Sequence, residues 1–168
     1  LFKFFLENKV DKVVEGASLV MAGNSYLQDY ASSLNRETTI FPTVLDTDRY
    51  QPTSNNNSDK LIIGWIGSPS TAPYLKTLIP SLSQLGLEGQ VLLRVIGGKA
   101  PKIPNIEVEE IPWSEETEVH YINSFDIGVM PLEDDEWSKG KCAFKLLQYM
   151  ACELPVIASN VGANIDVV

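Results

Sequence analysis

Short apolar runs alternate with helix-like segments from residue 61 onward, and this alternation constrains the fold more than any other feature of the sequence. The runs are continuously apolar, which is typical of parallel strands covered by helices on both faces. Repetition of strand and helix predicts an α/β fold with a doubly wound, Rossmann-like parallel sheet. The predicted strands are residues 61–67, 91–97, 106–111, 127–132 and 156–159, and the predicted helices are residues 72–85, 114–123 and 142–152.

The first 60 residues carry a shorter version of the same pattern, which then lapses. The elements expected here are helices at residues 3–15 and 25–34 and strands at residues 18–22 and 38–42. Asn24 is placed to cap the second of these helices. The stretch that ends at Lys60 contains an asparagine run and no periodicity, which is typical of a linker. The roughly 40 residues before it are too few to bury a core of their own. Because the chain also lacks an initiator Met, we expect it to be a piece of a longer protein.

The composition narrows the class of protein. Hydrophobic residues make up 44% and charged residues 21% of the 168 positions, as in ordinary globular domains. The net charge of −9 argues against nucleic acid as a partner, because no basic stripe is present to neutralise successive phosphates. No apolar run reaches transmembrane length, and the first residues do not form a signal peptide. Cys142 and Cys152 lie too far apart along one predicted helix to bridge, so we expect reduced thiols and a cytoplasmic location.

In a doubly wound sheet, ligands bind beyond the carboxyl ends of the strands, so the loops that follow the strands are the candidates. After the first of the five strands, Gly67 permits a close backbone approach, and the Ser68 hydroxyl is able either to cap the next helix or to bind a phosphate. This loop is neither a P-loop nor a dinucleotide-binding glycine motif. Trp113 follows another strand and either flanks a base or closes the rim of the core.

The helix predicted at residues 142–152 has a narrow cationic stripe. Lys141, Lys145 and Gln148 are spaced so that they share one helical face, and Gly140 marks the start of the segment. The N-terminus of a helix carries free N–H groups and the positive end of the helix dipole, which together suit a phosphate. The competing interpretation is a mostly buried helix with a thin solvated edge.

Metal and nucleophilic chemistry find little support in the sequence. The acidic residues 133–136 resemble a metal-binding motif, but no further ligands accompany them, so we expect a solvated loop and no metal. His120 is the only histidine, and we expect it on the surface. One histidine and two helical cysteines provide no Ser–His–Asp or Cys–His arrangement and no zinc-type spacing, so no catalytic residue is assigned.

Three segments of the chain resemble glycosyltransferase family 4, the group 1 type of GT-B glycosyltransferase. They are residues 24–52, residues 125–132 and residues 140–164. The resemblance implies that the chain contains the C-terminal, donor-binding half of a GT-B fold. It divides the chain into the end of an acceptor domain at residues 1–43, an interdomain linker at residues 44–60, and a donor-binding domain at residues 61–168 that is incomplete at its C-terminus.

The resemblance also implies a reaction, in which a sugar passes from a nucleotide-diphosphate-sugar to an acceptor, with retention and without a metal or other cofactor. The residues that it implies for the diphosphate or donor sugar are Gly67, Ser68, Gly140, Lys141 and Lys145. Gln148 falls where many relatives carry the second Glu of a paired-glutamate motif that binds the ribose, and Gly140 falls at the first. Neither Glu is present, although Gln148 can still hydrogen-bond a hydroxyl. Trp113 is the candidate to flank the base.

The implied partners are a nucleotide-sugar donor and a glycan, lipid or small-molecule acceptor, with peripheral membrane contact through the missing domain as an open possibility. Half a cleft cannot position two substrates, so we expect this chain alone to be inactive. Two alternatives stay open. One is a GT-B relative such as a nucleotide-sugar epimerase, which needs a titratable group in the cleft, for which His120 and the acidic loop at residues 133–136 are the only candidates. The other is a degenerate α/β interaction module, which the two absent glutamates favour and which nucleotide binding would exclude.

Overall fold

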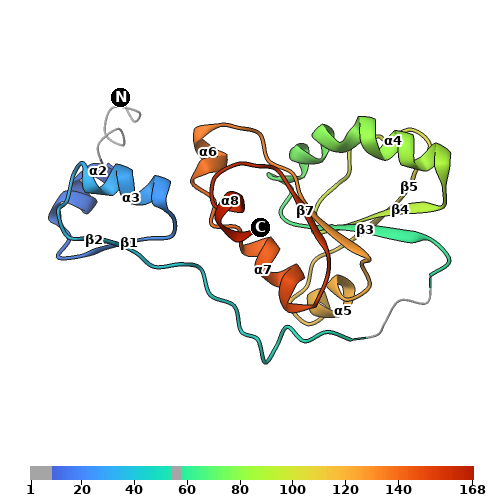
Figure 1. Cartoon of the computed structure of the whole chain (residues 1–168), viewed down its shortest axis with the longest axis horizontal. Helices are drawn as coiled ribbons and strands as arrows, with labels where there is room; N and C mark the ends of the chain where they lie inside the picture. Colours follow the sequence, from blue (N-terminus) through green and yellow to red (C-terminus); the bar gives the residue numbers. More distant parts are fainter. Residues whose placement is uncertain (1–8, 54–57) are drawn as a thin grey trace.

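The computed structural model describes residues 9–53 and 58–168, in two connected parts (Figure 1). The smaller part contains α2 (Lys9–Gly16), β1 (Val20–Ala22), α3 (Ser25–Ser32) and β2 (Thr38–Ile40), with β1 and β2 paired in parallel. Residues 3–8 of the first predicted helix lie outside the described residues. The predicted cap of α3 is present, because Asn24 Oδ1 accepts a hydrogen bond of 2.8 Å from the N–H of Leu27.

The larger part is a five-stranded sheet in which every neighbouring pair of strands is parallel. Its strands are β3 (Leu61–Ile66), β4 (Val91–Ile96), β5 (Glu107–Ile111), β6 (Ile127–Met130) and β7 (Val156–Ala158), in the order β5-β4-β3-β6-β7. This order and the helices between the strands confirm the predicted doubly wound α/β fold.

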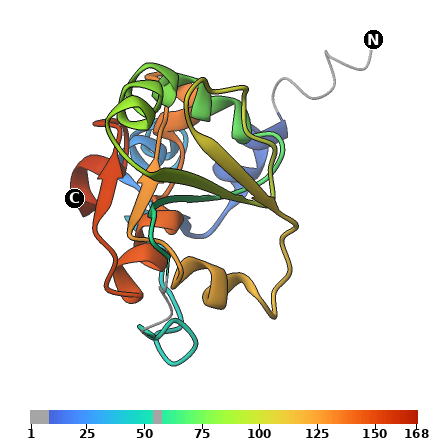
Figure 2. The ribbon, with the colours of Figure 1, turned by 90° about the vertical axis from the view of Figure 1, so that its right-hand side faces the viewer.

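Two core layers explain why the strands read as continuous apolar runs. Ile62 and Ile66 of β3 belong to one buried cluster, and Ile63 and Trp65 belong to the other. Successive side chains of a strand point to opposite faces, so each face of β3 is covered. Figure 2 shows α4 (Ile79–Glu88) on one side of the sheet and α5 (Glu118–Ile122) on the other.

Three helices differ from the sequence prediction. The segment predicted as one helix at 72–85 is a 3₁₀ helix, η1 (Ala72–Leu78), followed by α4, because Pro80 has no N–H with which to continue the helical hydrogen bonds. The helix predicted from residue 114 begins only at Glu118, after a turn that starts at Ser114. The helix predicted at 142–152 is α7 (Phe144–Ala151). The short helices α6 (Glu136–Lys139) and α8 (Asn164–Val167) were not predicted.

The chain changes direction within the sheet between β3 and β6. From β3 it proceeds to β4 and β5 on one side, and it then returns to β6 and β7 on the other. The two strands pair directly only at Ile63–Ile127 and Gly64–Gly128. Further along, the hydroxyl of Tyr149 from α7 lies between them, accepting a bond of 3.1 Å from the N–H of Ile66 and donating one of 3.4 Å to the carbonyl of Val129. The strands therefore diverge at their carboxyl ends, where the fold class places ligands.

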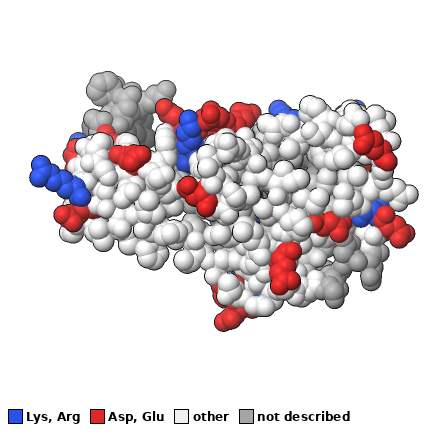
Figure 3. Space-filling view, viewed as in Figure 1, with Lys and Arg blue, Asp and Glu red and all other residues white. Residues whose placement is uncertain are grey.

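The smaller part contacts the larger one through Asn24. Its side-chain amide donates hydrogen bonds of 3.0 Å and 2.9 Å to the carbonyls of Lys139 and Lys141. The connecting segment also contributes to the core, because Tyr50 is buried against the cluster that contains Ile122. Acidic side chains are scattered over the face shown in Figure 3, where basic ones are few. No helix among the described residues is long and apolar enough to span a membrane.

Candidate functional site: a cationic pocket at the switch point of the sheet

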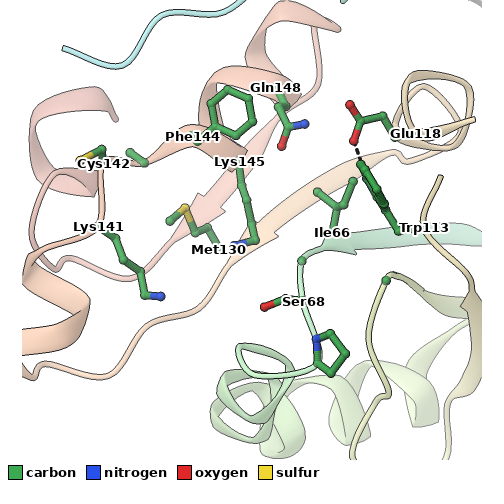
Figure 4. Close-up of a pocket in the computed structure, with 14 residues that line it drawn as sticks. Ile66, Ser68, Trp113, Glu118, Met130, Lys141, Cys142, Phe144, Lys145 and Gln148 are labelled. Carbon is green, nitrogen blue, oxygen red and sulfur yellow. Dashed lines mark hydrogen bonds between the residues drawn. The ribbon is translucent and has the colours of Figure 1, made fainter. Parts of the chain in front are cut away.

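A pocket of about 610 Å³ opens where β3 and β6 diverge (Figure 4). Its size is that of pockets that hold small molecules and cofactors. Several of its walls come from the ends of strands and from the segment that leads into α7. The polar and charged side chains and the close-packed glycine that matter for binding are among its lining residues, namely Gly67, Ser68, Trp113, Glu118, Lys141, Lys145 and Gln148. The pocket thus contains six of the seven site residues expected from the sequence, with Glu118 in addition.

Lys145 gives one side of the pocket its charge. Its ammonium nitrogen lies 5.7 Å from the centroid of the Trp65 ring, and none of the carboxylates in the described part of the chain forms an ion pair with it. Burial, together with the nearby charge of Lys141, lowers the pKa of Lys145 to about 8. A half-buried cation without an acidic partner is poised for an anionic ligand.

Lys141 is the second cation in the pocket. Its ammonium nitrogen lies 5.3 Å from the ring centroid of Tyr74 and 5.6 Å from that of Trp137. Burial lowers the pKa of Lys141, and the charge of Asp135 partly offsets that effect. Figure 4 shows the side chains of Lys141 and Lys145 extending into the same space. Two amines that face one cavity repel each other until an anion lies between them.

The expectation that Gly140 opens the phosphate-facing helix was wrong. Gly140 ends α6, and its N–H bonds to the carbonyl of Glu136 at 3.2 Å, so it does not line the pocket. α7 begins only after Ala143, whose φ of 55° lies in the left-handed region and turns the chain sharply into the helix. The N–H groups of Phe144 and Lys145 have no acceptor among the described residues, so they remain available at this end of α7.

Gly67 and Ser68 form the wall that follows β3. A Cβ on Gly67 would lie 2.5 Å from the Trp65 ring and 3.0 Å from Lys145 Cε, so only glycine leaves the lysine its place. The Ser68 hydroxyl pairs with that of Ser70 at 2.8 Å, while its N–H bonds to Thr71 Oγ1 at 3.2 Å. The sequence left open whether Ser68 shapes a turn or binds a phosphate. In the structure it shapes the turn and also faces the pocket.

The other end of the pocket is a hydrogen-bonded cluster around Glu118. Trp113 is about half exposed, and its indole N–H donates a bond of 2.6 Å to Glu118 Oε2. Glu118 Oε1 accepts from Arg49 Nη2 at 2.7 Å and from the hydroxyl of Tyr50. Gln148 Nε2 donates to the Tyr50 hydroxyl at 2.9 Å. Trp113 and Gln148, which lie 35 positions apart, are thus linked by one network.

Sequence reasoning missed Glu118, Arg49 and Tyr50. The last two lie in a segment without periodicity, and nothing local indicates that it folds against α5. A tryptophan at the edge of a core usually needs a partner for its N–H, but three glutamates follow Trp113 within five positions, and only the structure shows that Glu118 is the one that is not exposed.

The remaining polar residues have structural roles or lie on the surface. Asp135 caps α6 by accepting from the N–H of Ser138 at 2.6 Å, and Asp134 pairs with Lys139 at 3.0 Å. No group of three metal-ligating side chains occurs in the parts of the chain that the structure describes. His120 is exposed at a distance from the pocket lining, and Cys142 and Cys152 are not bridged.

Several solved structures share the fold of this chain, and two of them are structures of TarM. One is a mutant of S. aureus TarM in complex with fondaparinux, α-GlcNAc-glycerol and UDP, with a TM-score of 0.68 and 12% identity over 95% of this chain and 34% of that one. Another structure of TarM matches with a TM-score of 0.65 and 11% identity over 96% of this chain and 34% of that one. The chain therefore spans about a third of the length of the solved proteins that it matches.

The sequence itself identifies the family. No curated protein matches the chain. The family model described as "Glycosyl transferases group 1" matches residues 60–168, which is more than half of the chain. All the residues that line the pocket lie within this range. The resemblance seen in the sequence is thereby confirmed. This chain belongs to the group 1 family of glycosyltransferases.

Proposed function

We propose that this chain is the donor-binding part of an enzyme that transfers a sugar from a nucleotide-diphosphate-sugar to an acceptor. The observation that carries the proposal is Lys145, a desolvated cation without a carboxylate partner among the described residues, at the switch point of a doubly wound sheet. The whole enzyme would need a second domain for the acceptor, because one face of a cleft does not position two substrates.

The two ends of the pocket suit the two halves of such a donor. The diphosphate would lie against Lys141 and Lys145 and the N–H groups at the start of α7, where positive charge and free donors coincide. The nucleoside would lie toward Trp113 and Gln148, where an indole ring and hydrogen-bonding groups are available. The pocket volume of about 610 Å³ is in the range that small-molecule ligands occupy.

The chemistry requires stabilisation of a departing diphosphate. Two lysines and a helix N-terminus would supply fixed positive charge to the diphosphate as negative charge develops on it during departure of the sugar. Such charges substitute for the divalent cation that other enzymes use, so the proposed transfer needs no metal. Retention of configuration at the sugar carbon is proposed from the family resemblance alone. The acceptor, whether glycan, lipid or small molecule, would bind the part of the enzyme that lies outside this domain.

Calorimetric titration of the chain with UDP, GDP and ADP tests the proposal. UDP comes first because the TarM structure contains it. We expect one of the three to bind, with the same affinity in the presence of Mg²⁺ and of EDTA. Binding that requires Mg²⁺ would contradict the metal-independent mechanism. If none of the three binds, the interaction-module alternative replaces the proposal for this chain.

A further inference from the structure

The carboxylate of Glu118 is a buried charge at the nucleoside end of the pocket. Only 5% of the residue is exposed, yet it is among the residues that line the cavity. Its oxygens receive three hydrogen bonds from two segments, namely from Arg49 and Tyr50 before the sheet and from Trp113 after β5. A buried carboxylate is costly unless it is paired and hydrogen-bonded, and here the donors come from as far as 69 positions away.

The two oxygens of Glu118 are not equally engaged. Oε1 accepts from both Arg49 and Tyr50, whereas Oε2 accepts only from Trp113 among the described residues. Each carboxylate oxygen can accept two hydrogen bonds. Oε2 therefore keeps one acceptor site, and both Glu118 and its partner Trp113 line the pocket.

Gln148 offers a second acceptor beside it. Burial, followed by the hydrogen bond to Glu118, raises the pKa of Tyr50, so its hydroxyl stays protonated and donates to Glu118. The same hydroxyl accepts from Gln148 Nε2 at 2.9 Å, and Gln148 Oε1 accepts no hydrogen bond from the residues that the structure describes. Figure 4 shows Gln148 and Glu118 facing one another across the upper end of the pocket. Two acceptors side by side match a ligand with two neighbouring hydroxyl groups.

Building on the proposed function, we propose that Glu118 Oε2 and Gln148 Oε1 together bind the 2′- and 3′-hydroxyls of the donor's ribose. Glu118 thereby supplies the carboxylate that position 148 lacks in this chain. Arg49 and Tyr50 act as positioning residues, because they hold the far oxygen of Glu118 and the amide of Gln148 in place. The segment before the sheet is then part of the nucleotide site, although it does not contact the nucleotide.

Deoxynucleotides test the ribose clamp directly. The chain is titrated with UDP, or with GDP or ADP if that nucleotide binds more tightly, and with its 2′-deoxy and 3′-deoxy forms. A hydrogen bond to a charged acceptor is worth about 1.5–3 kcal/mol, so we expect at least one deoxy form to bind roughly 10–100-fold more weakly. The ratio of the affinity for the ribonucleotide to that for the deoxynucleotide is the deoxy ratio. In Glu118→Gln the deoxy ratio should shrink severalfold, and the affinity for the ribonucleotide itself should fall.

Glu115→Gln is the matched control. Glu115 also pairs with Arg49, at 3.0 Å, but its side chain is 74% exposed and lies outside the pocket lining, so its loss should leave the deoxy ratio unchanged. If Glu118→Gln does not fold, the deoxy series on the unmodified chain decides. Equal affinity for the ribo and deoxy forms overturns the clamp while the proposed function stands. An unchanged ratio in folded Glu118→Gln also overturns the role of Glu118. Absence of all nucleotide binding overturns both proposals.

Discussion

The ammonium nitrogen of Lys145 lies over the Trp65 ring, 5.7 Å from its centroid, and the Lys145 side chain lines the pocket. Trp65 is buried in the core of the sheet, so its ring is a fixed surface. Its contact with the cation is weaker than an ion pair, and it leaves the positive charge unneutralised. The fold thus holds a cation ready for an anionic ligand, and no carboxylate in residues 9–53 or 58–168 forms an ion pair with it.

Nucleotide affinity should fall as the pH rises above about 8. The pKa of Lys145 is lowered to about 8 in the ligand-free chain, and a bound diphosphate favours the protonated amine and raises that pKa. Above the free-state pKa, the affinity should therefore decrease by up to about tenfold per pH unit. Calorimetry between pH 7 and 9.5 measures this dependence. A flat profile in the unmodified chain, or an equally steep one in Lys145→Met, would contradict it.

Lys145→Met should stabilise the ligand-free chain. The pKa of Lys145 is lowered on folding, so the unfolded chain binds more protons between about pH 8 and 10.5, and the buried charge opposes folding below that window. Methionine fills similar space without a charge. We expect the melting temperature at pH 7 to rise by roughly 2–4 °C, the shift that about 1 kcal/mol produces in a chain of this size. The gain should shrink toward pH 10, and a lower melting temperature at pH 7 would contradict the prediction.

Gly67→Ala should damage both stability and binding. The added Cβ would lie 2.5 Å from the Trp65 ring and 3.0 Å from Lys145 Cε, so the ring and the lysine must shift. Overpacking of this kind costs about 1–3 kcal/mol. Urea denaturation and nucleotide titration measure the two effects. Gly89→Ala is the control, because nothing lies within 4 Å of its Cβ position and its φ of −166° suits any residue.

Asn24→Asp tests the contact between the two parts of the chain. Aspartate caps a helix as well as asparagine does, so α3 alone predicts little change. The exchange, however, removes the donors to the carbonyls of Lys139 and Lys141 and places a carboxylate against them. We expect a loss of about 1–3 kcal/mol in the free energy of unfolding, similar to or larger than that of Asn24→Ala. If urea denaturation gives the same free energy of unfolding for Asn24→Asp as for the unmodified chain, the contact contributes nothing to stability.

The sheet could be predicted from the sequence because its strands are apolar on both faces. Ile62 and Ile63 need opposite layers of core, and only a sheet covered on both sides provides them. The short helices α6 and α8 could not be predicted in this way, because four residues carry no periodicity. The cap at Asp135, which the sequence presented as part of an acidic run, determines where α6 begins.

The cationic side of the pocket could also be predicted, and its polar end could not. Lys145 and Gln148 were found because a single helix fixes their spacing. The carboxylate of Glu118 is held by a hydrogen bond from Tyr50, 68 positions away, and such a tertiary contact leaves no local pattern in the sequence. Gly140 was misplaced for a related reason. A glycine before a helix marks a turn, but here that turn closes α6, and the left-handed Ala143 starts α7.

Titration of UDP into the unmodified chain, Lys145→Met and Lys102→Met tests the central claim most directly. Lys102 is exposed and lies outside the pocket, so its variant carries the same change in net charge without the change in the site. We expect Lys145→Met to weaken binding by about 10–100-fold, as the loss of a charge-assisted contact does, and Lys102→Met to bind like the unmodified chain. Equal affinities in all three, or equal losses in both variants, would show that Lys145 does not hold the diphosphate.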